Sequence, residues 1–275
     1  MKAMTDPNQQ LAALRGRIDA MDEAIAKLLV ERTGIIRAVA ALKGEHWPNS
    51  CHIRPAREGQ MHEAVAKRFA GTDVAPAAAL AIWRQLIGSS TTLESPLIAT
   101  GLAHQAHHGW LVREYFGVNA GFLPEASIAD MLDNITRKQA NIAILPVPGA
   151  DDGDWWVDAS LFTTHGLSIF ASLPVTTDPL PGDAPRALAL ATVAPEPSGN
   201  DVSYVALTTK HDFDAAVLVA LAPAAIRSVD DRHHLLTFDG FIDAPSPILA
   251  TLRQALGAEL LSLTILGAHP RPISL

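Results

Sequence analysis

The chain has 275 residues, of which 48% are hydrophobic and 18% are charged, and its net charge is −8. This composition excludes a disordered chain and lacks the basic charge of a nucleic-acid-binding protein. The most apolar stretch, residues 215–226, is interrupted by Pro223 and is shorter than the roughly 20 residues of a membrane span. The polar N-terminus predicts no secretory signal, and a single cysteine, Cys51, excludes an internal disulfide framework. We therefore expect a cytoplasmic protein that contacts neither membranes nor nucleic acid.

Charge is distributed unevenly along the chain. Residues 1–94 contain 12 Lys and Arg against 10 Asp and Glu, whereas residues 95–275 contain 9 against 19. A small anionic ligand is therefore expected to bind in the N-terminal third, where the field attracts it.

A long amphipathic helix is predicted at the start of the chain, with Pro7 at its first position and Gly44 just after its end. Apolar residues recur every three or four positions, at Leu11, Leu14, Ile18, Met21, Ile25, Leu28, Ile35, Val39 and Leu42. A helix of about 36 residues is roughly 50 Å long, which is too long to be stable alone on a small domain. We expect it to pack against a second copy of the chain in an intertwined homodimer.

Two more helices are predicted before residue 95, one starting near Pro55 and running to Phe69, and one from Pro76 to Leu93. The first domain, residues 1–94, is therefore predicted to be all helical. The pattern changes at the Ser95–Pro96 step.

An α/β pattern follows from residue 97. The expected elements are a strand at 97–101, helices at 104–117 and 127–139, and strands at 140–147 and 167–175. Residues 176–200 hold five prolines around one short apolar run and are predicted to be partly linker. We place this second domain at residues 95–200.

The last segment, residues 201–275, is predicted to have a βαββαβ order, which is the ferredoxin-like split unit. Its elements are expected at 202–209, 212–222, 224–229, 233–241, 246–257 and 259–267. The whole chain is thus predicted to combine an all-α domain with an α/β lobe and a small βαββαβ module.

Arg32 occupies a position of the first helix where its neighbours on the same face are apolar. A buried guanidinium needs an anionic partner. One interpretation is an ion pair with Asp19 or Glu23 of a partner helix. The other is a ligand, because Lys43 lies 11 residues further on the same face, so that the two cations could bracket a small dianion. Arg15 lies about 25 Å from Arg32 along the helix and could reach such a site only from a second chain.

These residues carry a family resemblance. Residues 11–43, the IRPAREGQM segment at 53–61 and the IWRQLIGSS segment at 82–90 resemble the three helices of the all-α (AroQ-type) chorismate mutases. The resemblance implies a homodimer without cofactor or metal that rearranges chorismate to prephenate in phenylalanine and tyrosine biosynthesis. The implied substrate-binding residues are Arg15 from one chain and Arg32, Lys43, Arg57, Glu58, Ser90 and Glu94 from the other, with Arg32, Lys43 and Glu94 in the catalytic role.

Two positions depart from the usual family pattern. Glu94 stands where Gln is common, and a carboxylate facing a developing negative charge helps only when it is protonated, so we expect the fastest turnover at mildly acidic pH. The alternative is that Glu94 is a solvated helix end. Arg54 stands where Asp is frequent, which leaves its role open.

The C-terminal 180 residues resemble a reduced prephenate dehydratase followed by an ACT-like module. The family's Gly-Thr-Tyr-Ser turn is replaced by Gly101-Leu102-Ala103, and its Glu-Asn pair by Val147-Pro148. A mutase with a non-catalytic tail is therefore expected. The alternatives are a bifunctional mutase and dehydratase, a non-catalytic dimer that senses an amino acid, and a lyase acting on isochorismate.

Three histidines, His104, His107 and His108, have helical spacing that could hold zinc. No fourth ligand follows them in the sequence, so they are predicted to lie on a solvated face.

Overall fold

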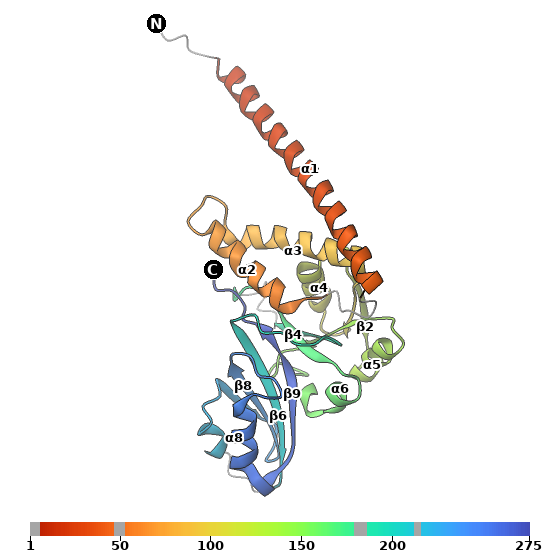
Figure 1. Cartoon of the computed structure of the whole chain (residues 1–275), viewed down its shortest axis with the longest axis vertical. Coiled ribbons are helices and arrows are strands. Elements are labelled where there is room, and N and C mark those ends of the chain that lie inside the picture. The colour runs from red at the N-terminus through yellow and green to blue at the C-terminus, as the bar shows by residue number, and fades with distance from the viewer. Residues whose placement is uncertain (1–5, 47–52, 179–185, 212–215) are drawn as a thin grey trace. The chain divides into compact units, whose positions relative to one another are not determined.

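The computed structural model describes residues 6–46, 53–178, 186–211 and 216–275 (Figure 1). The chain forms two compact units, residues 1–50 and residues 51–275, which are treated separately below.

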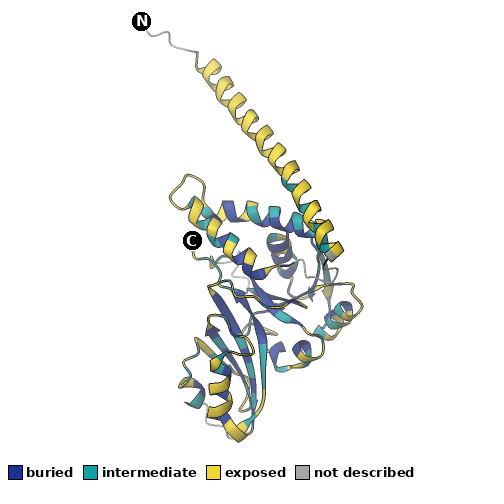
Figure 2. Ribbon diagram, in the orientation of Figure 1, coloured by how far each residue is buried: buried dark blue, intermediate teal, exposed yellow. Residues whose placement is uncertain are grey.

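The first unit is the helix α1, Pro7–His46. The helix passes through Gly44, so the predicted end at that glycine is wrong. Glycine costs a helix only about 1 kcal/mol relative to alanine, which a helix of 40 residues tolerates. The predicted apolar positions are exposed along its length, from Val39 at 42% to Met21 and Leu28 at 64% (Figure 2). Among the helices that the structure describes, none combines the length and apolar character needed to cross a membrane.

The second unit begins with helices α2, Pro55–Phe69, and α3, Pro76–Glu94, which confirm the predicted boundaries closely. Each starts with a proline at its first helical position, where the missing N–H costs nothing. Both helices pack against the α/β region, because Val65 and Leu80 belong to the same buried cluster as Leu111 and Phe170. The apolar core against which α2 and α3 pack is therefore supplied in part by the α/β region.

Among the described residues of the second unit, nine strands form one continuous sheet in the order β2-β1-β3-β5-β4-β9-β6-β8-β7. The first half contains β1 Ile98–Leu102, β2 Gly121–Glu125, β3 Ile142–Pro146, β4 Ser168–Leu173 and β5 Ala187–Ala191. Its helices are α4 His108–Phe116, α5 Ile128–Thr136, the 3-10 turn η1 Trp155–Val157 and α6 Ser160–Thr163.

Two of these strands were not predicted. The strand β5 is formed by the short apolar run inside the segment expected to be partly linker, a run for which no strand was predicted. The strand is central in its half of the sheet, between β3 and β4, and all five of its side chains are buried. The edge strand β2 contains Pro124, which an edge position tolerates because one side of the strand needs no ladder hydrogen bonds.

The second half of the sheet confirms the predicted βαββαβ order. It consists of β6 Asp201–Thr209, α7 Ala216–Val219, β7 Ala225–Ser228, β8 His233–Asp239, α8 Pro247–Leu256, the 3-10 turn η3 Gly257–Glu259 and β9 Leu260–Pro270. Its core lies under α7 and α8 and includes Leu218, Leu236 and Leu252. The predicted fold class, helices followed by an α/β lobe and a βαββαβ module, is confirmed.

The two halves of the sheet meet at one pair of residues, Ile169 on β4 and Gly267 on β9. Gly267 has φ +128°, a backbone conformation that residues other than glycine rarely adopt. A Cβ atom there would lie within about 2.5 Å of the Ile169 backbone nitrogen and oxygen. Glycine at this position therefore lets the two strands approach closely enough to form one sheet.

Candidate active site

The three cationic candidates of the first unit lie on one continuous helix. Arg15 is exposed, whereas Arg32 and Lys43 are half-buried. Burial lowers the pKa of the Arg32 guanidinium from its ordinary value. Since α1 is unbroken between these positions, Arg15 and Arg32 of one chain are about 25 Å apart along the axis and cannot bind the same small molecule.

One acid suggested as a partner for Arg32, Glu23, bonds a lysine of its own helix in this structure. Its carboxylate lies 3.2 Å from the Lys27 ammonium, in an exposed i,i+4 pair. Exposed pairs of this kind contribute only about 0.3–0.5 kcal/mol, so the contact does not exclude a different partner for Glu23 in an assembly.

The remaining four candidates lie on α2 and α3 of the second unit. Ser90 and Glu94 are one helical turn apart on the same side of α3, and both are half-buried. The Ser90 hydroxyl donates to the Leu86 carbonyl at 2.5 Å. On α2, Arg57 is exposed while its neighbour Glu58 is buried, as expected for side chains about 100° apart around a helix.

Glu58 takes part in a buried ion pair that sequence analysis did not predict. Its Oε2 atom lies 2.8 Å from Nη1 of Arg84 on α3, and the Arg84 side chain is 1% exposed. The same Nη1 lies 2.9 Å from Nε2 of His62, one turn after Glu58. Burial, followed by the Arg84 charge, lowers the pKa of His62 to about 3, so its imidazole is neutral and Nε2 can accept a hydrogen bond from Nη1 of Arg84.

Arg84 is also bound to the α/β region. Its Nε donates to the backbone carbonyl of Tyr115 on α4 at 2.6 Å, and Nη2 donates to the same oxygen. The guanidinium carbon lies 3.8 Å from the centre of the Tyr115 ring, within range of a cation–π contact. A charged residue in the apolar sequence LAIWRQLIG was a signal for this cluster, of the same kind that drew attention to Arg32.

The departure at Arg54 has a local explanation. Its guanidinium pairs with the Glu196 carboxylate at 3.2 Å, between the residue preceding α2 and the segment before β6. Both side chains are about half exposed, and such pairs contribute roughly 0–1 kcal/mol. Arg54 thus has a partner in the second unit.

The histidines at the start of α4 do not form the solvated face that their spacing suggested. His108 is fully buried, and burial lowers its pKa to about 3, whereas His104 is exposed and bonds Asp152 at 2.5 Å. That expectation is therefore wrong for His108. Over the described ranges, no group of three potential ligands is arranged to hold a metal ion.

Comparison with known proteins addresses the helical region first. Residues 14–95 match the family model for chorismate mutase type II. This region is a chorismate mutase domain. All seven candidate residues, from Arg15 to Glu94, lie within the matched range.

Two curated relatives are named for two activities. Both are named bifunctional chorismate mutase/prephenate dehydratase. The Aquifex aeolicus protein is 28% identical over 152 residues, covering 53% of this chain and 41% of its own length. The Stutzerimonas stutzeri protein is 29% identical over 165 residues, covering 58% and 45%. The chain therefore spans less than half the length of these relatives.

Solved structures similar to this chain include a prephenate dehydratase from Streptococcus mutans, at 16% identity and TM-score 0.44. The match covers 65% of this chain and all of that structure. A second match, described as a novel type of quorum quenching acylase, has 16% identity and TM-score 0.46, over 63% of this chain and 94% of that one.

Proposed function

We propose that the protein is a chorismate mutase that converts chorismate to prephenate for phenylalanine and tyrosine biosynthesis. The observation that carries the proposal is the match of residues 14–95 to the mutase family, with four cationic candidate residues inside the matched range. A dianionic substrate fits these cations, and it fits the N-terminal third of the chain, where the positive residues concentrate.

The rearrangement suits a site built from charge and hydrogen bonds. It is a pericyclic reaction, so it needs no nucleophile, metal or cofactor, and catalysis consists of folding the substrate into a compact conformer and stabilising charge on the breaking ether oxygen. Arg15, Arg32 and Arg57 would bind the two carboxylates, since a guanidinium can bind a carboxylate through two parallel hydrogen bonds.

The remaining candidates act on the centre of the substrate. Lys43 would contact the ether oxygen and one carboxylate, and protonated Glu94 would donate to the same ether oxygen. Ser90 would hydrogen-bond a carboxylate, and Glu58 would accept from the ring hydroxyl. The contacts of Lys43 and Glu94 with the ether oxygen become stronger as charge develops there in the transition state, which is the condition for rate acceleration.

A homodimer is part of this proposal. Arg15 would enter the site formed by Arg32 and Lys43 of the other chain, because the spacing along α1 prevents one chain from supplying both ends of the clamp. The apolar positions of α1 support the proposal, since Ile18, Met21 and Ile25 are 55–64% exposed in the single chain. Burying such side chains against a second α1 would be favourable by roughly 1.5–3 kcal/mol each.

One experiment separates this function from its alternatives. The purified protein is mixed with chorismate at neutral pH, and the amounts of chorismate, prephenate and phenylpyruvate are followed by chromatography. A mutase produces prephenate alone, a bifunctional enzyme produces phenylpyruvate as well, and a regulatory dimer leaves chorismate unchanged. A parallel incubation with isochorismate tests the lyase alternative. Loss of isochorismate without turnover of chorismate would contradict the proposal.

A further inference from the structure

Helix α2 joins the proposed mutase site to the α/β region. It carries Arg57 and Glu58, and the side that faces away from solvent contacts α3 and the end of β9, while its His62 ring lies edge-on to Tyr115 of α4. The buried side chains on this face include Glu58, His62 and Val65. The position of α2, and with it that of Glu58, therefore depends on residues outside the matched mutase range.

The polar contacts of Arg84 define one orientation of its guanidinium. All three nitrogens have partners: Nη1 bonds Glu58 and His62, while Nε and Nη2 both bond the Tyr115 carbonyl. Unpaired, a guanidinium that is 1% exposed would be strongly destabilising, so each of these contacts offsets the cost of burying it. Because Tyr115 belongs to the central α/β region, Arg84 connects Glu58 to that region through two hydrogen-bonded steps.

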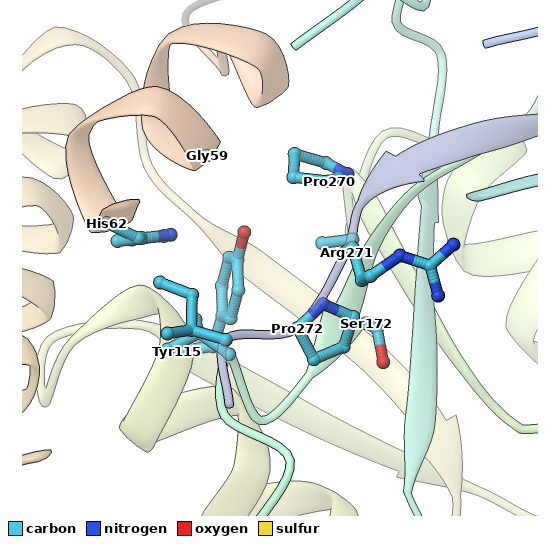
Figure 3. A pocket seen from close by; sticks show the side chains of 10 residues that line it. Gly59, His62, Tyr115, Ser172, Pro270, Arg271 and Pro272 are labelled. Carbon is cyan, nitrogen blue, oxygen red and sulfur yellow. The ribbon is translucent and has the colours of Figure 1, made fainter. Parts of the chain in front are cut away.

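A second contact holds α2 from the side of the C-terminal strand. Gly59 follows Glu58 directly and faces Pro270 at the end of β9 (Figure 3). A Cβ atom at Gly59 would lie 2.5 Å from both Cβ and Cγ of Pro270, so no larger residue fits without movement of α2. The cavity beside it, lined also by His62 and Tyr115, measures about 20 Å³, which is room for a single water molecule.

We propose that the α/β region positions Glu58 for the mutase reaction, with Arg84 as the positioning residue. Arg84 holds Oε2 of the carboxylate, which directs Oε1 toward the ring hydroxyl of the substrate. The close contact between Gly59 and Pro270 fixes the height of α2 above the sheet. The C-terminal region thus serves the mutase site as a scaffold. This inference rests on the proposed mutase function and on the role given there to Glu58.

The principal test compares four variants with the wild-type dimer: Arg84→Met, Arg84→Lys, Glu58→Gln and the double variant Glu58→Gln/Arg84→Met. For each, kcat and KM for chorismate are measured per folded protein, below the unfolding temperature of every variant. Arg84→Met is expected to lower kcat/KM about 10- to 100-fold, mainly through kcat, because misplacing one group by about 1 Å has effects of this size.

The control and the combined variants distinguish positioning from general stability. Arg84→Lys keeps a charge beside Glu58 and should recover part of the lost activity. The double variant should lose no more than Glu58→Gln alone, because both substitutions remove the same interaction. As a matched control, Arg137→Met removes an exposed pair with Asp133 and should leave kcat/KM unchanged.

A variant that does not remove a buried charge tests the same inference independently. Gly59→Ala would stabilise an isolated helix by about 1 kcal/mol, yet here it should lower kcat/KM because α2 must move away from Pro270. The double variant Gly59→Ala/Pro270→Gly removes the obstructing ring and should restore activity. This pair remains informative if Arg84→Met fails to fold.

The outcomes separate this inference from the proposed function. Wild-type protein without mutase activity would overturn both. Wild-type activity together with unchanged kcat/KM in folded Arg84→Met, or in Gly59→Ala, would overturn the scaffold role alone. A loss of stability with normal kcat/KM per folded molecule would likewise show that the cluster is structural only.

Discussion

The two units of this chain obtain their stability in different ways. In α1 the apolar side chains of Ile18, Met21 and Leu28 are 59–64% exposed, whereas in α2 and α3 the side chains of Val65 and Leu80 are 3% and 1% exposed. The first helix presents a surface that needs a partner, and the other two already have one in the α/β region. The residues of the proposed site are divided between these two situations, so assembly and tail packing are both expected to control activity.

The largest expected effect concerns Arg32. Arg32→Ala should lower kcat/KM at least 10- to 150-fold, because a charged hydrogen bond to a carboxylate contributes about 1.5–3 kcal/mol and more when water is excluded. The protein should remain a folded dimer, as measured by light scattering and circular dichroism. Activity within a few-fold of wild type would remove Arg32 from the site.

Mixing variants tests whether the site is shared between chains. Arg15→Ala should also inactivate the enzyme. When Arg15→Ala and Arg32→Ala chains are mixed and allowed to exchange, one of the two sites in each hybrid has both arginines, so part of the activity should return. Unchanged inactivity after proven subunit exchange would mean that each site is built from a single chain.

The next effect tests the need of α1 for a partner. Ile25→Glu places a charge on the exposed apolar positions and should shift the proposed dimer to monomers, with loss of mutase activity, because burying an unpaired carboxylate is costly. Val30→Glu is the matched control: Val30 is 75% exposed and lies outside the three- and four-residue repeat of apolar positions. Sedimentation velocity measures both. Equal effects of the two substitutions would argue against pairing through these positions.

Removing the tail should have a smaller but clear effect. Every proposed site residue lies before residue 95, which by itself predicts that residues 1–94 suffice for activity. Since Val65 and Leu80 share their core with Leu111 and Phe170, we expect the truncated protein to be less stable and less active than the full chain. Thermal unfolding and kcat/KM of the two forms give the measurement. A truncated dimer with wild-type kcat/KM would show that the tail is dispensable.

The smallest predicted effect is a change in acid stability at His62. Its folded pKa of about 3 lies below the ordinary value of 6.5, so folding favours the neutral ring. Above pH 6.5 the His62 ring is neutral in both the folded and the unfolded protein, and the free energy of unfolding has its full value. As the pH falls from 6.5 toward 3, protonation of His62 in the unfolded chain lowers that free energy. His62→Gln keeps an acceptor for Arg84 without the titration, and its Tm should fall roughly 5 °C less than that of wild type between pH 7 and 4.5.

A surface histidine provides the control for this experiment. His211 is exposed, so His211→Gln removes a histidine without disturbing a buried cluster and serves as the comparison variant. His108 and His269 are also buried with lowered pKa values, to about 3 and about 4, and they keep part of the acid sensitivity in every variant. Identical pH profiles for wild type and His62→Gln would contradict the prediction.

Local signals predicted most of the fold. Pro55 and Pro76 marked helix starts, and the apolar period of α1 was visible without any tertiary information. The strand β5 was missed because its short Ala-Leu run lies among prolines, and only pairing with β3 and β4 makes it a strand. Pro124 hid β2 in the same way. Pairing partners distant in sequence decide such segments, and local composition does not record them.

The site was predictable as a set of residue types and less so as contacts. Arg32 was recognised because a cation interrupts an apolar face, and Arg84 meets the same criterion in α3. It was overlooked because its partners come from two other helices: Glu58 and His62 on α2 and the backbone of Tyr115 on α4. A backbone carbonyl has no signature in the sequence, so this type of partner becomes visible only in three dimensions.

The close approach at Gly267 divides the molecule in a way that matters for its evolution and its engineering. On one side of the Ile169–Gly267 pair lie five strands and on the other four, and the four-stranded half has a separate core around Leu236 and Leu252. Recombination at this boundary could exchange the terminal module as a cassette, provided that the incoming strand also carries a glycine where it meets Ile169. A new module can therefore join this sheet only if its strand has a glycine at the position opposite Ile169.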